Sequence, residues 1–467
     1  MTNDEAGDIP VRRIAEYVTS LSENDVSRQV RHRFIVHAID AIGCALAGMD
    51  GSPSQIARRL AASGPSDAGV SVIGVDRPTV PEYAAFANTT MVRYLDFNDT
   101  FVGATSAHLS DLMPAVLASG ESVHATGSQV IAGFHVAYEV FGALASAVAL
   151  EQLGWDNGSF LKVAAAAGVA RMLRQSTAQV AHSVSLAVTT GLPFHVSRTG
   201  ELSHWKAASS GYAAMAGLFA ARLASAGMTG PARPFSGAGG VWFRALPHFD
   251  LAAIGAGADG GSVVERSGIK RFPADYVAQP SIEAMIRLHR DGVSAADITS
   301  IDVRTYGLAW RFTGGGAGDH DEKWNPQTRE TADHSLPFLM AVALADGDVT
   351  TGSFTSDRIH DPELRGFMRK VTVSEDANIS SNWIDDPAHD LDVRLSDGAR
   401  RNLRFSRTRG HHKNPMNDDE ITAKFTANAE RVLGSAQLRE LLETLWRLED
   451  LADIGDLMRL LRQVPTA

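Results

Sequence analysis

The stretch VIAGFHVAYEVFGALASAVAL, residues 130–150, is the longest apolar run of the chain. It is long enough to cross a lipid bilayer. However, it contains His135 and Glu139, consists largely of small residues and has no basic flank. These features favour a helix buried inside a large helical core, and we expect no membrane association.

Alanine-rich segments with helical periodicity surround this run. Between residues 113 and 230 one such segment follows another, for example GSFLKVAAAAGVARML and AASSGYAAMAGLFAARLASAG. Apolar residues also recur at spacings of three and four from Ser22 to Gly48 and from Pro81 to Phe97. The pattern predicts an all-α domain in which the 81–97 helix delivers Asp96 at its end.

The sequence changes in character near residue 260. A glycine-rich run, GAGADGGS (255–262), precedes alternating segments typical of strands at 298–307 and 391–408, the latter with an Asp397-Gly398 turn. Helical patterns occupy 279–292, 333–347 and 417–463. We therefore predict a mainly α fold. A large all-helical domain comprises residues 1–264 and 409–467, and a smaller α+β domain, 265–408, is inserted into it.

Composition excludes several functional classes. The chain has 467 residues, 44% of them hydrophobic, and a net charge of -11, which argues against nucleic acid as a partner. The single cysteine, Cys44, lies in an apolar run, so we expect a small buried side chain and no internal disulfide. The polar N-terminal segment lacks the apolar run of a signal peptide, and we expect a cytoplasmic enzyme.

Motifs for metals and nucleotides are weak or missing in the sequence. The run GGGAG (314–318) lacks the spacing of a phosphate-binding loop, and we interpret it as a flexible loop. His411 and His412 stand beside a lysine, with no carboxylate at ligand spacing. These motifs therefore give little support for a metal site or a phosphate-binding loop.

Polar clusters next to apolar helices are the remaining candidates for a site. Together they supply cations, carboxylates and histidine, which suits binding a small anionic polycarboxylate and moving a proton next to one of its carboxylates. Lysines would also stabilise the negative charge that develops when the adjacent carbon loses its proton. The clusters are RYLDFNDT (93–100), HLSD (108–111), GWDNG (154–158), SHWK (203–206), IKRFP (269–273) and TADHSLPF (331–338).

The RYLDFNDT segment, followed after seven residues by HLSD, resembles the signature of the MmgE/PrpD family. Further matches occur in the same order, among them SHWKAASSGYAAMAGLFAARLASAGMTGP, IKRFPADYVAQPSIEAMIRL and RGHHKNPMNDDEITAKF. The resemblance covers residues 30–440. It implies a helical domain made from both chain ends, an inserted α+β lid domain, a homodimer and an active site in the cleft between the domains, without metal or organic cofactor.

The resemblance also implies which residues form the site. The family's active-site positions fall on Asp96, Thr100, His108, Lys206 and Lys270. We expect Asp96, His108, Lys206 and Lys270 to be catalytic, with the lysines holding substrate carboxylates and Asp96 or His108 removing the proton. The expected substrate contacts are Arg93, Thr100, Asn157 and Arg271.

The chain departs from the family pattern at several positions. Asn157 stands where the family usually has histidine, and Val277 and Ala278 stand where histidine or cysteine is common. An amide cannot exchange protons near pH 7 as an imidazole does. A mechanism that uses a second histidine at position 157 is therefore in doubt here.

Known members of the family include 2-methylcitrate dehydratase, cis-aconitate decarboxylase and iminodisuccinate epimerase. The resemblance implies a hydro-lyase similar to 2-methylcitrate dehydratase. Decarboxylation of a cis-aconitate-like acid and epimerisation of a dicarboxylate are alternatives that use the same cations. A non-catalytic homologue that keeps the anion pocket is an alternative of another class.

Overall fold

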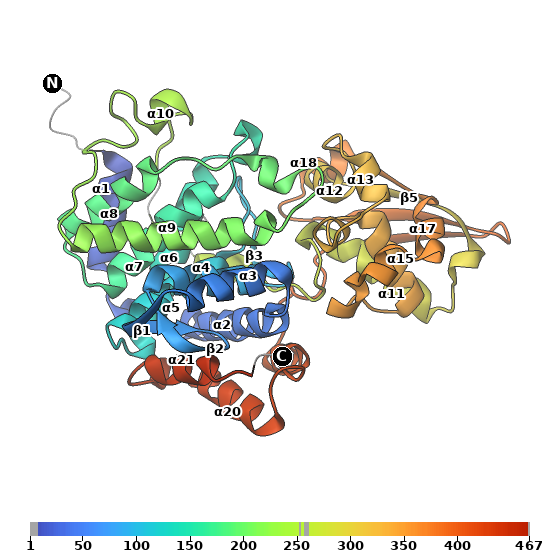
Figure 1. The fold of residues 1–467 in the computed structure, drawn as a ribbon. Coiled ribbons are helices and arrows are strands. Elements are labelled where there is room, and N and C mark those ends of the chain that lie inside the picture. The colour runs from blue at the N-terminus through green and yellow to red at the C-terminus, as the bar shows by residue number, and fades with distance from the viewer. Residues whose placement is uncertain (1–7, 252–253, 256–260, 466–467) are drawn as a thin grey trace.

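The computed structural model describes residues 8–251, 254–255 and 261–465, and most of the predicted 255–262 linker lies outside them. The mainly α fold class is confirmed (Figure 1). Two hydrophobic cores account for most of the buried apolar side chains. One is built from residues up to Ile269 and again from Ile421 onward, and the other from residues between Phe272 and Val393.

The larger domain consists of helices from both ends of the chain. At the start, Ser27 caps α2 through the backbone N–H of Val30, so the helix begins later than the predicted Ser22. The elements are α1 (Ile9–Ser20), α2 (Arg28–Gly48), α3 (Ser52–Ala62), β1 (Pro65–Val72), β2 (Val75–Thr79), α4 (Pro81–Tyr94), β3 (Thr100–Phe101), α5 (Met113–Ser122), α6 (Gly127–Ala147), α7 (Gly158–Met172), α8 (Thr177–Thr189), α9 (Trp205–Ser225), α10 (Val241–Arg244), α19 (Asp418–Ala429), α20 (Ser435–Trp446) and α21 (Gly455–Arg462).

The longest apolar run of the sequence forms α6. This helix is long and apolar enough to cross a membrane, and 83% of its most apolar window is buried inside the protein. Small residues let the neighbouring helices approach closely. A side chain at Gly217 on α9 would come within 2.3 Å of the carbonyl oxygen of Lys162 on α7. Glycine at this position therefore allows α9 to lie directly against α7.

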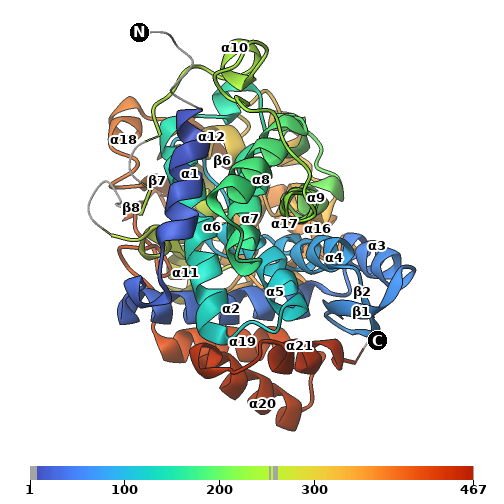
Figure 2. The same ribbon diagram turned by 90° about the vertical axis from the view of Figure 1, so that its left-hand side faces the viewer.

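The C-terminal helices return to the larger domain, beneath α2 (Figures 1 and 2). Phe425 of α19 lies against Gly43 of α2, where an added Cβ would be 3.1 Å from its ring. The backbone N–H of Gly74 donates to the carbonyl of Leu461, which ties α21 to the turn between β1 and β2. Residues from the two chain ends therefore share one core.

The smaller domain is built on a four-stranded sheet in the order β6-β5-β7-β8. The predicted turn at Asp397-Gly398 joins β7 to β8, and Gly398 has a φ of +87°. Buried side chains of β5 and of the apolar helix α15 contribute to its core. The elements are β4 (Ser267–Gly268), α11 (Gln279–Arg290), β5 (Ile298–Thr305), α12 (Gly307–Thr313), α13 (His320–Trp324), α14 (Arg329–Ala332), α15 (Leu336–Asp346), α16 (Ser356–Ile359), α17 (Pro362–Met368), β6 (Val371–Glu375), α18 (Ala377–Ser381), β7 (His389–Leu395) and β8 (Arg400–Phe405).

Candidate active site

Asp96 lies two residues beyond the end of α4, in a conformation that turns the chain sharply. Its φ is +51°, in the left-handed region that few residues other than glycine adopt. Its backbone N–H donates to the carbonyl of Arg93. The carboxylate is almost completely buried. A strained, buried aspartate needs strong local partners, because burial alone disfavours its charge.

Three cations supply those partners. Arg93 Nη1 lies 3.1 Å from Asp96 Oδ1, Lys206 Nζ lies 2.9 Å from Oδ2, and Lys270 bonds both Oδ1 and the backbone carbonyl, the latter at 2.8 Å. Burial raises the pKa of a carboxyl, but Arg93, Lys206 and Lys270 hold the pKa of Asp96 well below its usual range. Asp96 is therefore ionised at neutral pH.

Lys206 occupies the first turn of α9, where the helix dipole disfavours a cation. Asp333, just before α15 in the smaller domain, compensates at 2.6 Å. Burial alone would raise the pKa of Asp333, but the neighbouring Lys206 and His334 outweigh this effect and lower it. Lys206 therefore joins carboxylates from both domains.

His108 is held in one tautomer. Its Nδ1 lies 2.5 Å from the carbonyl oxygen of Asp99, which can only accept, so Nδ1 carries the hydrogen. Burial, together with Arg93 and Lys270, lowers the pKa of His108 well below 6.5. The neutral ring then has a free lone pair on Nε2, which lies 3.5 Å from Asp96 Oδ1. This nitrogen is suited to act as a general base.

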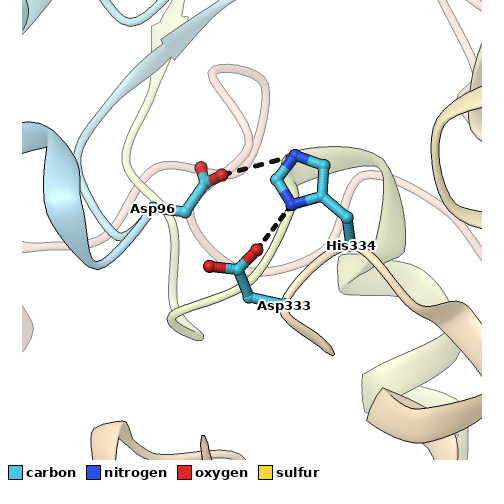
Figure 3. A group of neighbouring side chains, drawn as sticks. All are labelled: Asp96, Asp333 and His334. Atoms are coloured by element: carbon cyan, nitrogen blue, oxygen red, sulfur yellow. Dashed lines mark hydrogen bonds and ion pairs between the residues drawn. The ribbon is translucent and has the colours of Figure 1, made fainter. Parts of the chain in front are cut away.

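His334 contacts Oδ2 of Asp96, the carboxylate oxygen that His108 does not contact. Its Nε2 is 3.5 Å from Asp96 Oδ2, and its Nδ1 is 2.6 Å from Asp333 Oδ1 (Figure 3). The same Nε2 also lies 3.0 Å from Asp275 Oδ2. The TADHSLPF segment stood out in the sequence as a polar cluster, but the predicted site residues include neither Asp333 nor His334. Only tertiary structure places this segment against Asp96.

Asp96, Asp333 and His334 offer ligand atoms close enough to share a metal ion. Lys206 already bonds this group. Its Nζ lies 2.9 Å from Asp96 Oδ2, 2.6 Å from Asp333 Oδ1 and 3.1 Å from His334 Nδ1. The ammonium of Lys206 thus lies close to the same three side chains that a metal would bind.

An inner pocket opens in front of this cluster, between the two domains. Of the predicted site residues, Arg93, Thr100, His108 and Asn157 line it. Asp96, Lys206 and Lys270 are not among its lining residues and are at most 2% exposed, so they lie behind the pocket wall. The remaining lining residues are Val102, Ser106, Ala107, Glu151, His195, Arg198, Asp275, Tyr276, Val277, Leu308, Phe312 and His334.

Arg271 is not brought to the site. Its side chain is 42% exposed and lies 3.6 Å from Glu283, with the guanidinium over the ring of Phe272. Lys270 turns inward to Asp96, and the position of Arg271 does not favour the expected substrate contact.

Asn157 belongs to a rigid wall of the pocket. Its amide donates to the carbonyl of Ser106 at 2.9 Å. The neighbouring Asp156 accepts from Ser197 and from Nε of Arg198, at 2.7 and 2.9 Å. Arg198 outweighs the effect of burial and lowers the pKa of Asp156. This wall presents one guanidinium and one amide to the pocket.

Besides Asp275, Tyr276 and His334, the sequence reasoning missed Glu151, His195 and Arg198, which also line the pocket. Nothing in their local sequence marks them as functional. Burial raises the pKa of Glu151 to about 7, and burial lowers the pKa of His195. The Nδ1 atom of His195 is buried and has no hydrogen-bond partner among the described residues. The pocket therefore contains groups able to donate and to accept a proton near neutral pH.

An outer cavity of about 670 Å³ adjoins the inner pocket and shares His195, Arg198, Glu151 and Phe312 with it. Arg266 and Arg311 also line this cavity. Neither has a carboxylate within ion-pair distance among the described residues. The cavity is also lined by the carboxyl side chains of Glu151, Asp319 and Glu375, so positive and negative groups both face it.

The fold and the site define a two-domain protein with a buried carboxylate held by cations and a neutral imidazole facing an interdomain pocket. Two family models match the chain, the MmgE/PrpD N-terminal domain over residues 12–252 and the MmgE/PrpD C-terminal domain over 272–449. The chain belongs to the MmgE/PrpD family, as the sequence resemblance predicted.

Curated relatives align over most of the chain. The 2-methylcitrate dehydratase of Escherichia coli (strain K12) is 25% identical over 460 residues, which cover 92% of this chain and 93% of the relative. The 2-methylcitrate dehydratase of Cupriavidus necator is 28% identical and covers 71% of each chain. The cis-aconitate decarboxylase of Mus musculus is 26% identical, with 82% of this chain and 78% of the relative covered.

Proposed function

We propose that the protein is a cofactor-independent lyase that removes water from a small branched polycarboxylate of the 2-methylcitrate type. The observation that carries this proposal is the pairing of His108, a neutral imidazole that lines the pocket, with Asp96, whose pKa is held well below its usual range. The 2-methylcitrate dehydratases among its relatives support the substrate class.

In the proposed reaction, Nε2 of His108 takes the proton from the carbon next to a substrate carboxylate. The electron pair of that C–H bond forms the new double bond, and the C–O bond on the neighbouring carbon breaks. The imidazolium that forms lies 3.5 Å from Asp96, which stabilises its charge. Asp96 thus acts through His108 and remains ionised.

Glu151 is the proposed acid for the departing hydroxyl group. It lines both the inner pocket and the outer cavity, and its pKa of about 7 lets the carboxyl carry a proton near neutral pH. The proton passes from its carboxyl to the hydroxyl oxygen, which leaves as water. Exchange with solvent through the outer cavity then restores Glu151 and His108.

The cationic groups divide into two roles. Arg198 and Arg93 line the pocket and are the proposed ligands of substrate carboxylates, with Thr100 and Asn157 as hydrogen-bonding neighbours. Lys206 and Lys270 are bonded to Asp96. Their proposed contribution is to hold the charge and position of Asp96, a revision of the expectation that they bind substrate directly.

Decarboxylation of a cis-aconitate-like acid is the second candidate, since one relative is a cis-aconitate decarboxylase. That reaction has no leaving hydroxyl, but the carbanion left after loss of carbon dioxide must gain a proton, so it needs an acid as well. Epimerisation needs proton-transfer groups on both faces of the carbon, and Asn157 cannot serve as one. A non-catalytic anion-binding protein would not need a neutral imidazole beside an ionised carboxylate.

The test is to incubate pure protein with 2-methylcitrate, citrate, cis-aconitate and iminodisuccinate in deuterium oxide. Formation of the unsaturated acid from methylcitrate is the expected result. Release of carbon dioxide from cis-aconitate, or deuterium incorporation with inversion of iminodisuccinate, would select an alternative. No reaction with any of the four would reject the proposed substrate class.

A further inference from the structure

A second buried ion pair lies directly behind the Asp96 cluster. Lys424 of α19 places its Nζ 2.6 Å from Oδ1 of Asp40 on α2. Both side chains are buried, at 6% and 0% exposure. Neither residue lines the inner pocket or the outer cavity, so neither can touch a substrate bound there.

The same ammonium donates to two backbone carbonyls. Lys424 Nζ lies 2.8 Å from the carbonyl oxygen of Phe97 and 2.8 Å from that of Lys270. It also lies 3.7 Å from the centre of the Phe97 ring. With Asp40 at ion-pair distance, three oxygen atoms thus surround the ammonium.

These carbonyls belong to the segments that carry the cluster. Phe97 directly follows Asp96, and Lys270 is itself a ligand of Asp96. The segments come from distant parts of the sequence, and the strand pairing between them, β3 with β4, spans only two residues on each side. Lys424 therefore adds a third connection, from the returning C-terminal part of the chain.

We propose that Lys424, held by Asp40, is a positioning residue that fixes Asp96 and Lys270 relative to each other. The inference rests on the proposed function of the Asp96 cluster, because positioning matters for turnover only if that cluster serves the reaction. An error of about 1 Å in a catalytic group lowers rates by about 10²-fold. Loss of Lys424 should accordingly reduce kcat while KM changes little, because the pocket lining is untouched.

A purely structural ion pair makes a different prediction, and a double variant separates the two. Lys424→Met leaves Asp40 buried without a partner, so Tm should fall. In the Asp40→Asn/Lys424→Met variant no charge is left unpaired, and Tm should recover most of the loss. The carbonyls of Phe97 and Lys270 still lack their donor, so kcat should stay about 10- to 100-fold below that of the unchanged protein.

Lys370→Met is the matched control. Lys370 also donates to two backbone carbonyls, those of Ala295 and Ile298, but it lies in the smaller domain away from the pocket. Its loss should lower Tm and leave kcat within about twofold of the original value. Recovery of kcat together with Tm in the double variant, or an equal loss of kcat in the control, would overturn the positioning role.

A crystal structure of the double variant gives a readout that needs no turnover. Catalytic groups function within about 0.5 Å of their productive geometry. A displacement of Lys270 from Asp96 larger than this supports the proposal, and an unchanged ion pair overturns it. Should the protein act on none of the polycarboxylates, the proposed function fails, and this measurement still decides whether Lys424 positions the pair.

Discussion

Lys206 and Asp333 form a 2.6 Å ion pair across the junction of the two domains. Lys206 is the second residue of α9 in the larger domain, and Asp333 immediately follows α14 of the smaller one. Both side chains are almost fully buried, so solvent screens the pair very little. The cluster around Asp96 is thus completed only when the domains are together.

Replacing Lys206 by methionine should destabilise the protein strongly. The change leaves the carboxylates of Asp96 and Asp333 buried with one cation fewer, a type of loss that costs about 3–5 kcal/mol. Urea unfolding measures this loss as a decrease in the free energy of unfolding. The Lys206→Met/Asp333→Asn variant should recover part of the loss, and a single variant as stable as the original protein would contradict the assigned burial of this pair.

His108→Asn should abolish most of the activity without unfolding the protein. The amide can keep a hydrogen bond to the carbonyl of Asp99, but it supplies no base at the position of Nε2. Loss of a general base lowers kcat by about 10²- to 10⁴-fold. His124, which is 81% exposed, provides the control His124→Asn, for which we expect unchanged kinetics. Retained turnover in His108→Asn would reject this histidine as the base.

The pH dependence of kcat should report Glu151. Its pKa is raised to about 7, so the proton it donates is present below pH 7 and lost as pH rises through that value. We expect kcat to fall on the alkaline side. In Glu151→Gln the alkaline fall should disappear, with kcat reduced by about 10²-fold throughout. An unchanged alkaline limb would assign the acid role to another group.

The acidic side of the profile should report His108. Its pKa lies well below 6.5, so the neutral base persists at pH 6.5 and is lost only as pH falls further. The same shift affects stability, because between the folded and unfolded pKa values the unfolded state binds more protons. His108 therefore contributes less to stability as pH falls below 6.5.

Arg271→Gln should leave the reaction almost unchanged, since its guanidinium lies on the surface beside Glu283. Surface substitutions of this kind alter stability by about 0.5 kcal/mol or less. Arg198→Gln is the informative partner, because Arg198 lines the pocket and holds Asp156. We expect kcat/KM to fall by at least about tenfold in Arg198→Gln. Equal kinetics for the two variants would contradict the placement of the anion site.

We also propose that α9 forms part of a homodimer interface. Trp205, Tyr212 and Phe219 recur every seven residues along it and are about half exposed. Light scattering after size exclusion should give twice the chain mass for the original protein and a monomer for Tyr212→Glu/Phe219→Glu. Phe243→Glu, at an exposed residue of α10, is the control; a dimeric double variant would place the interface elsewhere.

The sequence was most informative where the requirement is local. Helical periodicity predicted the α-rich fold, because apolar residues that recur at spacings of three and four define one face of a helix. The Asp397-Gly398 turn was equally predictable, since glycine supplies the positive φ that the turn needs. Asp96, His108, Lys206 and Lys270 were found only because several short motifs resemble those of one family.

The sequence by itself determined the family, the helical class and most of the charged groups around Asp96. Only tertiary structure decided that Lys206 and Lys270 bond Asp96 and lie behind the pocket wall, and that Arg271 faces solvent. It also brought His334, Glu151 and Arg198 to the pocket. The reason is physical: secondary structure follows from neighbouring residues, whereas a buried charge takes whichever partner the packing of distant segments provides.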